Sequence, residues 1–269
     1  MPEFYQGPQP LQPPAIDLWL LSTENVAATD LAALKACLGP QEQEQLRHRR
    51  LAQAQQQMIT SRGCLRHLLS RYTDRPPDAL SFSYGPRGKP LLDCYQGNNQ
   101  ALQFNLSHSG ERLLVAVSGA AGVRAIGVDL EVLRPITQLP GLCHRCLTPS
   151  EAAQVLSQPN SLVEQQFLRY WTGKEACLKA LGLGIADSLQ SIELTLNPPE
   201  LTPELTPIGV TAQGDLEHPG QLYQWQPELG YVGAIAVQLA PHLTPNFRFY
   251  QTTPAALIGD RWERHPRVK

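Results

Sequence analysis

Two acidic residues with a spacing of two positions are the first feature of this 269-residue sequence that could do chemistry. Asp129 and Glu131 lie at the end of the apolar segment Ala125–Leu130, which predicts a buried β-strand. Side chains at positions i and i+2 of a strand share a face, so the two carboxylates lie close together. They repel one another unless a cation lies between them, and Mg²⁺ prefers such oxygen ligands. Taken alone, the pair is better explained by solvated acids at a strand end.

A predicted helix over about Leu162–Leu181 supplies a third acid and a lysine. Trp171, Glu175 and Lys179 follow one another at intervals of four, so they climb one side of this helix beside an apolar stripe. Glu175 and Lys179 therefore emerge at the edge of a buried face. In isolation they are explained by an i,i+4 ion pair, which stabilises a helix only slightly.

Groups that can donate hydrogen bonds to a phosphate occur in two further segments. The segment Asn105–Gly110, expected to be a tight turn, contains Ser107 and His108, and Lys89 lies in a turn rich in Gly and Pro. A turn held by serine side chains and a solvated loop lysine are the simpler explanations of the two segments. Together with the carboxylates, however, these are the groups that phosphoryl transfer requires.

The elements that must position these residues repeat in order along the chain. Strands are predicted at Ile16–Leu21, Ser81–Tyr84, Phe104–Leu106, Leu113–Val117, Ala125–Leu130, Ser191–Leu196, Leu222–Gln226 and Tyr231–Leu239, and helical regions at Gln41–Tyr72 and Thr148–Leu181. The order strand, helices, strands occurs twice and predicts an α+β fold of two pseudo-symmetric halves. The expected boundaries are 1–15 for a Pro-rich lead-in, 16–120 and 121–245 for the halves, and 246–269 for a C-terminal tail.

Composition narrows the class of protein. Lys and Arg number 22 against 24 Asp and Glu, which argues against a protein that coats nucleic acid. No apolar run approaches the roughly 18 residues of a membrane span. The first 21 residues lack a basic start and contain five prolines, which is untypical of a secretory signal. The six cysteines are therefore expected to be reduced, and Cys143 and Cys146 lack the second ligand pair of a zinc site. We expect a cytoplasmic protein.

Four motifs, in this order and separation, resemble those of the 4′-phosphopantetheinyl transferase superfamily. The segments are Gly88–Pro90, Phe104–Ser109, Ile126–Glu131, and Trp171–Ala176 with Lys179. The first two resemble the additional motifs of the larger, surfactin-synthetase-type branch. The resemblance extends from about residue 16 to residue 240. It implies one chain of two pseudo-symmetric halves with the active site in the cleft between them.

The resemblance also implies an activity and a set of roles. Such an enzyme moves the phosphopantetheine arm of coenzyme A to a serine of an apo acyl or peptidyl carrier protein and releases adenosine 3′,5′-bisphosphate. It implies a Mg²⁺ site formed by Asp129, Glu131 and Glu175. Coenzyme A would contact Arg62, Lys89, Ser107, His108, Asp129 and Lys179. Glu175, or a water that it orients, is the candidate base, and Lys179 would reach the pyrophosphate. We expect a monomer that binds coenzyme A and a carrier protein, without nucleic acid or membrane.

Two assignments stay open. The family binds the nucleotide 3′-phosphate with basic residues of the first helical region, but the matching stretch Pro40–Gln45 has none. Arg47, Arg49, Arg50 or Arg62 could replace them, and Arg62 is our prediction. An acid at the position of Glu151 has been linked to catalysis in the family. A capping box that begins at Thr148 explains the same residue without chemistry.

Two other functions compete with the transferase. The first is a non-catalytic module that binds coenzyme A or a carrier protein on the same fold, which would not require a site of three carboxylates. The second is a Mg²⁺-dependent nucleotide hydrolase. It accounts for the acids but not for Lys89 or the Ser107–His108 motif.

Overall fold

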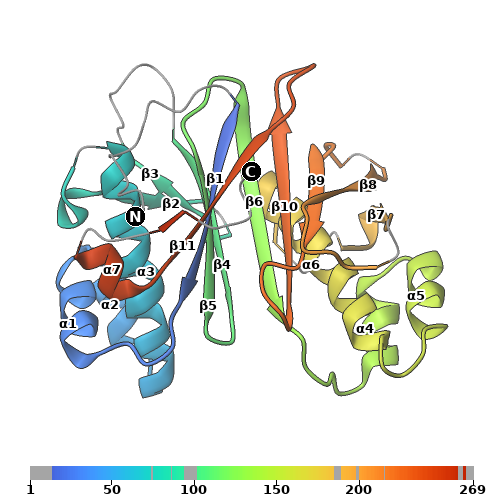
Figure 1. Ribbon diagram of the computed structural model, residues 1–269, viewed down its shortest axis with the longest axis horizontal. Coiled ribbons are helices and arrows are strands. Elements are labelled where there is room, and N and C mark those ends of the chain that lie inside the picture. Colours follow the sequence, from blue (N-terminus) through green and yellow to red (C-terminus); the bar gives the residue numbers. More distant parts are fainter. Residues whose placement is uncertain are drawn as a thin grey trace.

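Two five-stranded sheets are present in the described residues of a computed structural model of the protein (Figure 1). The first sheet contains, in spatial order, β12 (Glu263–Arg264), β11 (Asn246–Thr252), β1 (Ala15–Ser22), β5 (Arg112–Ser118) and β4 (Gln103–Ser109). The second contains β6 (Val123–Val132), β10 (Tyr231–Leu239), β9 (Gln221–Trp225), β8 (Thr206–Ala212) and β7 (Ile192–Thr195). The structure describes residues 14–73, 75–85, 87–93, 102–184, 189–197, 200–214, 216–259 and 263–264. The predicted α+β class is confirmed.

Helices cover the outer side of each sheet, so that the molecule has helix, sheet, sheet and helix layers (Figure 1). The first half contains α1 (Ala28–Ala36), α2 (Pro40–Arg47), α3 (Ala52–Thr73), α7 (Pro254–Ile258) and the hairpin of β2 (Phe82–Tyr84) and β3 (Pro90–Leu92). The second half contains α4 (Leu139–Cys146), α5 (Pro149–Leu156) and α6 (Val163–Leu181). None of the helices in the described residues combines the length and apolar character needed to cross a bilayer.

Strand β1 shows how the sequence builds these layers. Its side chains alternate between two cores, because successive residues of a strand point to opposite faces. Trp19 and Leu21 pack with the helices of the first half. Ile16 and Leu18 pack instead against apolar residues of the second half, among them Val128. The two sheets therefore share a core, which fixes the halves relative to one another.

Gly127 brings helix α6 unusually close to strand β6. A Cβ atom at this position would lie 2.1 Å from the carbonyl oxygen of Ala176 and 2.3 Å from the amide nitrogen of Ala180. No side chain fits in that space, so only glycine allows this approach. Helix α6 ends at Leu181, as predicted, and is capped by Gly182, whose φ of +70° is the left-handed conformation that glycine favours.

The structure corrects two expectations. The predicted tail 246–269 is wrong, because β11 pairs in parallel with β1 and α7 packs on α1 and α3. The predicted turn at Asn105–Gly110 is also wrong, since Gln103–Ser109 is strand β4 and the chain turns at Gly110, where φ is +54°. The predicted lead-in, apart from residues 14 and 15, and Cys94 lie outside the described residues.

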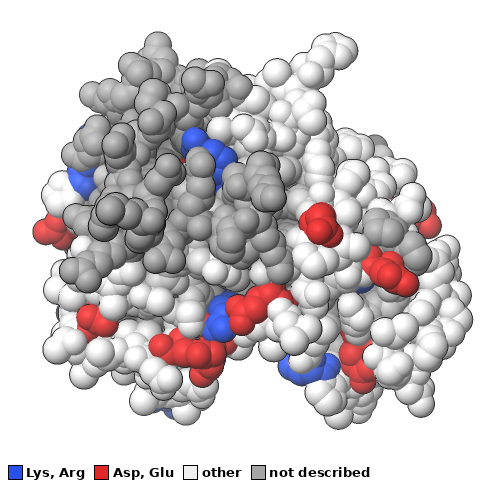
Figure 2. Space-filling view, viewed as in Figure 1, with Lys and Arg blue, Asp and Glu red and all other residues white. Residues whose placement is uncertain are grey.

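Charged side chains are few and scattered on the described part of the face in Figure 2. Basic and acidic groups alternate there with uncharged surface, in agreement with the net charge of −2.

Candidate active site

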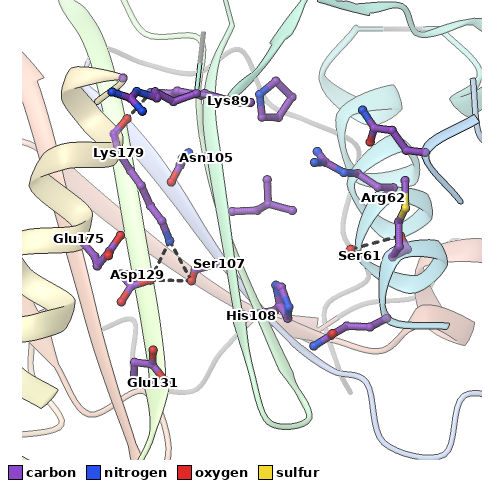
Figure 3. Close-up of a pocket in the computed structure, with 18 of the residues that line it drawn as sticks. Ser61, Arg62, Lys89, Asn105, Ser107, His108, Asp129, Glu131, Glu175 and Lys179 are labelled. Carbon is purple, nitrogen blue, oxygen red and sulfur yellow. Dashed lines mark hydrogen bonds and ion pairs between the residues drawn. The ribbon is translucent and has the colours of Figure 1, made fainter. Parts of the chain in front are cut away.

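A cavity of about 480 Å³ lies at the seam, between α3 and β4 of the first half and β6 and α6 of the second (Figure 3). Eight side chains in its lining are those that the sequence analysis selected: Arg62, Lys89, Ser107, His108, Asp129, Glu131, Glu175 and Lys179. The fold thus brings together residues from five separate segments of the chain.

Lys179 is the centre of the polar contacts in this cavity. Its ammonium lies 2.7 Å from Oδ1 of Asp129 and donates to Oγ of Ser107 at 3.1 Å and to the carbonyl oxygen of Val128 at 3.1 Å. The Ser107 hydroxyl in turn donates to Oδ1 of Asp129 at 2.7 Å (Figure 3). The close packing of α6 at Gly127 is what puts Lys179 within reach of both strands.

Two carboxylates of the cavity have unmet hydrogen-bonding capacity. Oδ2 of Asp129 and Oε1 of Glu175 are buried and have no hydrogen-bond partner among the described residues. Burial raises the pKa of Asp129, although the Lys179 ammonium acts in the opposite direction. Burial, and next the charge of Asp129, raise the pKa of Glu175 to about 7. A buried oxygen without a partner is costly, so this pattern suits a site that receives a ligand.

Glu131 lies further along β6 and is more exposed. Its Oε2 accepts from Ser109 at 2.8 Å and from Arg134 at 2.9 Å. Its charge also contributes to raising the pKa of Glu175, behind burial and the charge of Asp129. The three acids predicted from the sequence therefore face one cavity (Figure 3).

The donor set of this acidic wall fits a hard cation. In the described residues, no three His, Cys, Asp or Glu side chains are already arranged as a set of metal ligands. In this structure the positive charge that faces Asp129 is the ammonium of Lys179. The two buried carboxylate oxygens without partners, together with Glu131 in the same cavity, are nevertheless of the ligand type that Mg²⁺ prefers.

The opposite wall carries cationic groups. The guanidinium of Arg62 lies 5.7 Å from the centre of the Tyr84 ring, and its Nη1 is buried with no hydrogen-bond partner in the described residues. Lys89 donates to the carbonyl oxygens of Ile126 at 3.0 Å and Lys179 at 2.8 Å, and burial lowers its pKa to about 8. In this structure Lys89 thus ties its loop to β6 and α6.

Comparisons with known proteins give matches in both halves of the chain. A family model of the 4′-phosphopantetheinyl transferase superfamily matches residues 125–226, and one described as 4′-phosphopantetheinyl transferase, N-terminal, matches residues 25–120. The 4′-phosphopantetheinyl transferase HetI of Nostoc sp. is 37% identical over 185 residues, which are 69% of this chain and 76% of HetI. The chain belongs to the 4′-phosphopantetheinyl transferase superfamily.

Two more relatives have names of the same kind. A putative 4′-phosphopantetheinyl transferase of Synechocystis sp., slr0495, is 33% identical over 66% of this chain and 70% of its own length. The 4′-phosphopantetheinyl transferase psf-1 of Bacillus pumilus is 31% identical over 49% of this chain and 53% of its own length. Membership of the superfamily confirms the resemblance and the enzyme class, whereas the surfactin-synthetase-type branch stays a prediction.

Among the candidate arginines, only Arg49 and Arg62 line the cavity of this superfamily member. Arg47 pairs with Glu44 at 2.7 Å on the surface, with 72% of its own side chain exposed. The arginines of the first helical region were hard to rank from sequence, because the helical periodicity alone does not say which face meets the second half.

The cavity lining also contains five polar residues that were not selected from the sequence: Gln45, Gln57, Ser61, Arg87 and Asn105. Arg87 and Asn105 belong to segments that had been selected, the turn before Lys89 and the strand before Ser107. A signal was therefore present for both. The charge of Arg87 beside Lys89 and the alternation of polar side chains along β4 could have identified them.

Glu151 is not part of the cavity lining. It is 1% exposed, accepts from the amide of Thr148 at 2.8 Å and from that of Leu194 at 2.7 Å, and pairs with Lys174 at 2.6 Å. The capping box that the sequence predicts is confirmed. These contacts account for Glu151 without a part in the reaction.

Proposed function

We propose that this enzyme transfers the 4′-phosphopantetheine group of coenzyme A to a serine hydroxyl of an apo acyl or peptidyl carrier protein. The reaction would depend on Mg²⁺ and release adenosine 3′,5′-bisphosphate. The observation that supports this most directly is the single cavity in which three carboxylates and Lys179 face cationic and hydroxyl groups of the first half. Phosphoryl transfer requires both sets.

The acidic wall is the proposed metal site. Asp129, Glu131 and Glu175 would hold Mg²⁺, and the unpartnered oxygens of Asp129 and Glu175 support this assignment. When bound, the ion would neutralise charge on the pyrophosphate oxygens of coenzyme A.

The remaining residues would bind the rest of the substrate. Lys179 is a compact point charge that suits the pyrophosphate, and Ser107 and His108 beside it would donate hydrogen bonds to phosphate oxygens. Arg62, with its unpartnered Nη1, is the proposed ligand of the 3′-phosphate. Lys89 would also contact the coenzyme A phosphates after it exchanges its two carbonyl partners for them.

The proposed chemical step is a displacement at the phosphorus atom that bears the pantetheine arm. The serine oxygen forms a bond to this phosphorus, and the bond from phosphorus to the bridging oxygen breaks. The serine proton passes to Glu175, directly or through a water, and the nucleotide leaves with the bridging oxygen. The position of Glu175 in the cavity lining, beside Asp129 and Lys179, supports its role as the base.

We further propose a cytoplasmic monomer. The five described cysteines are free and buried, which supports a reducing compartment. Both walls of the cavity come from one chain, so that a second copy is not needed to complete it.

The test combines purified protein, coenzyme A, Mg²⁺ and a panel of apo carrier proteins. We expect the carrier mass to increase by one phosphopantetheine group, and EDTA to prevent the increase. Binding of coenzyme A in calorimetry without any mass increase would favour the non-catalytic module. Release of adenosine 3′,5′-bisphosphate without a carrier protein would favour a hydrolase. Comparison of kcat/KM across the panel would identify the preferred carrier.

A further inference from the structure

Strands β4 and β6 meet at the seam through side chains rather than through a shared ladder of backbone hydrogen bonds. They are edge strands of different sheets. Three β4 side chains at alternate positions cross the gap between them. Oδ1 of Asn105 accepts from the amide of Val128 at 2.9 Å, and Ser107 donates to Asp129 at 2.7 Å. Ser109 makes the third contact.

Ser109 makes two hydrogen bonds to β6 through one hydroxyl group. Its Oγ donates to Oε2 of Glu131 at 2.8 Å and accepts from the amide of Val132 at 3.1 Å. The residue is 8% exposed, so water competes little for these bonds. Ser109 is not part of the cavity lining, in contrast to Ser107, so it is placed to hold the acid from behind.

We propose that Ser109 is a positioning residue that holds the Glu131 carboxylate at the acidic wall of the cavity. This inference rests on the proposed function, in which Glu131 is a metal ligand. Residues that orient a metal ligand from behind are typically worth a factor of about 10 to 100 in metal affinity.

The surroundings of Glu131 explain why such a residue is needed. The other described partner of its carboxylate is Arg134, whose side chain is 52% exposed, whereas that of Glu131 is 19% exposed. Without the Ser109 hydroxyl, Arg134 is the remaining described partner of Glu131. An exposed arginine would then draw the carboxylate towards solvent and partly neutralise it. The buried hydroxyl opposes that displacement without adding charge.

Ser118 offers a matched control. It lies at the end of β5, is 0% exposed, donates to the carbonyl oxygen of Ala15 at 2.7 Å and accepts from the amide of Ala120 at 3.2 Å. Its hydroxyl therefore makes one donated and one accepted bond, as that of Ser109 does. It makes them away from the cavity lining.

The experiment compares Ser109→Ala, Ser109→Thr and Ser118→Ala with the wild-type protein. Mg²⁺ affinity is measured by calorimetry with coenzyme A present, and kcat and KM for coenzyme A by the carrier mass increase. For Ser109→Ala we expect Mg²⁺ affinity to fall by about 10-fold or more and kcat to fall, with KM for coenzyme A unchanged. Ser109→Thr keeps the hydroxyl and should recover most of the Mg²⁺ affinity and most of kcat. Ser118→Ala should lose about as much thermal stability as Ser109→Ala does, but it should bind Mg²⁺ as tightly as wild type.

Each other outcome overturns a defined claim. Equal Mg²⁺ affinity in Ser109→Ala and wild type overturns the positioning role alone. So does an equal loss of affinity in Ser118→Ala, because the effect would then be one of stability. A wild-type protein that binds no Mg²⁺ overturns the proposed function and this inference together.

Discussion

Helix α6 carries two lysines that each pair with an acid, and the two pairs differ in how completely their bonds are satisfied. Lys174 is 0% exposed, and its ammonium lies 2.6 Å from Glu151 and donates to the carbonyl oxygens of Leu189 and Ile192. The side chain of Lys179 is 28% exposed, and its partner Asp129 keeps one buried oxygen without a described partner.

The difference separates a pair that holds the fold from one that is available for a ligand. Glu151 accepts from two backbone amides as well as from Lys174, so both of its oxygens are engaged. Asp129 and the neighbouring Glu175 each have an unused buried oxygen instead. Such unmet capacity is costly in a folded protein and therefore indicates a functional site more reliably than burial alone.

The largest effect is expected when the pair of Lys174 and Glu151, whose hydrogen bonds are complete, is broken. Lys174→Met leaves the Glu151 charge buried without its counter-charge, which typically destabilises a protein by about 3–5 kcal/mol. The free energy of unfolding by urea measures this loss. The transfer rate of the folded fraction should stay close to that of wild type. The double variant Glu151→Gln/Lys174→Met should recover stability, and a double variant less stable than Lys174→Met would contradict our description of the pair.

Breaking the pair of Lys179 and Asp129 should instead reduce activity strongly and stability only slightly. Asp129→Ala removes a proposed metal ligand and should reduce kcat/KM by more than about 100-fold, beyond the effect of losing an orienting group. The thermal unfolding midpoint should change little, because one oxygen of Asp129 is unsatisfied in the folded state. Transfer at the wild-type rate by this variant would remove the metal assignment.

The titration of Glu175 tests the same comparison, because it makes the stability of the protein depend on pH. Its pKa rises from an ordinary 4.5 to about 7 in the folded protein, so the folded state binds more protons than the unfolded state between these values. Stability without metal should therefore fall as pH rises from 4.5 to 7. Glu175→Gln should remove a cost of up to about 3 kcal/mol at pH 8, at 1.36 kcal/mol per unit.

The measurement is urea unfolding in EDTA at about pH 4 and pH 8, the two sides of that titration range. Glu175→Gln should be more stable than wild type at the higher pH and similar to it at the lower. Mg²⁺ should then stabilise wild type but not the variant. An equal difference at both pH values would mean that the carboxyl does not titrate in this range.

Arg62 lies on the wall of the cavity opposite the three acids, and its substitution should give the smallest effect. Arg62→Ala removes a guanidinium whose Nη1 has no described hydrogen-bond partner and should raise KM for coenzyme A by about 10-fold, the value of one charged hydrogen bond. KM for 3′-dephospho-coenzyme A should not change. Arg47→Ala, which removes an exposed arginine paired with Glu44, is the control. If Arg49→Ala gives the effect and Arg62→Ala does not, the 3′-phosphate assignment moves to Arg49.

The parts of the fold that the sequence predicted well are those decided by neighbouring residues. Helix α6 ends at Gly182 and helix α5 begins after Thr148 because a left-handed cap and a capping box are local devices. The apolar strand that carries Asp129 was equally clear. Its two acids indicated a metal site only in combination with Glu175 and Lys179 of the next helix.

The parts that could not be predicted depend on contacts between distant segments. Strand β11 exists because it pairs with β1, and the contact of Arg248 with Asp17 joins positions 231 residues apart. The same holds within the site. The carbonyl partners of Lys89 and the contact of Ser109 with Glu131 depend on how closely the two halves approach, which no pattern within one segment records.

The pairing of β11 with β1 also sets the order in which the protein can be completed during translation. Strand β1 leaves the ribosome before its parallel neighbour, the segment Asn246–Thr252, and most of the described chain lies between the two in sequence. One edge of β1 stays open throughout that interval, and an open edge can associate with another nascent chain. The sheet of the first half is therefore completed only after the second half has been made, and a polypeptide that is cut short before residue 246 has an exposed edge on an apolar strand.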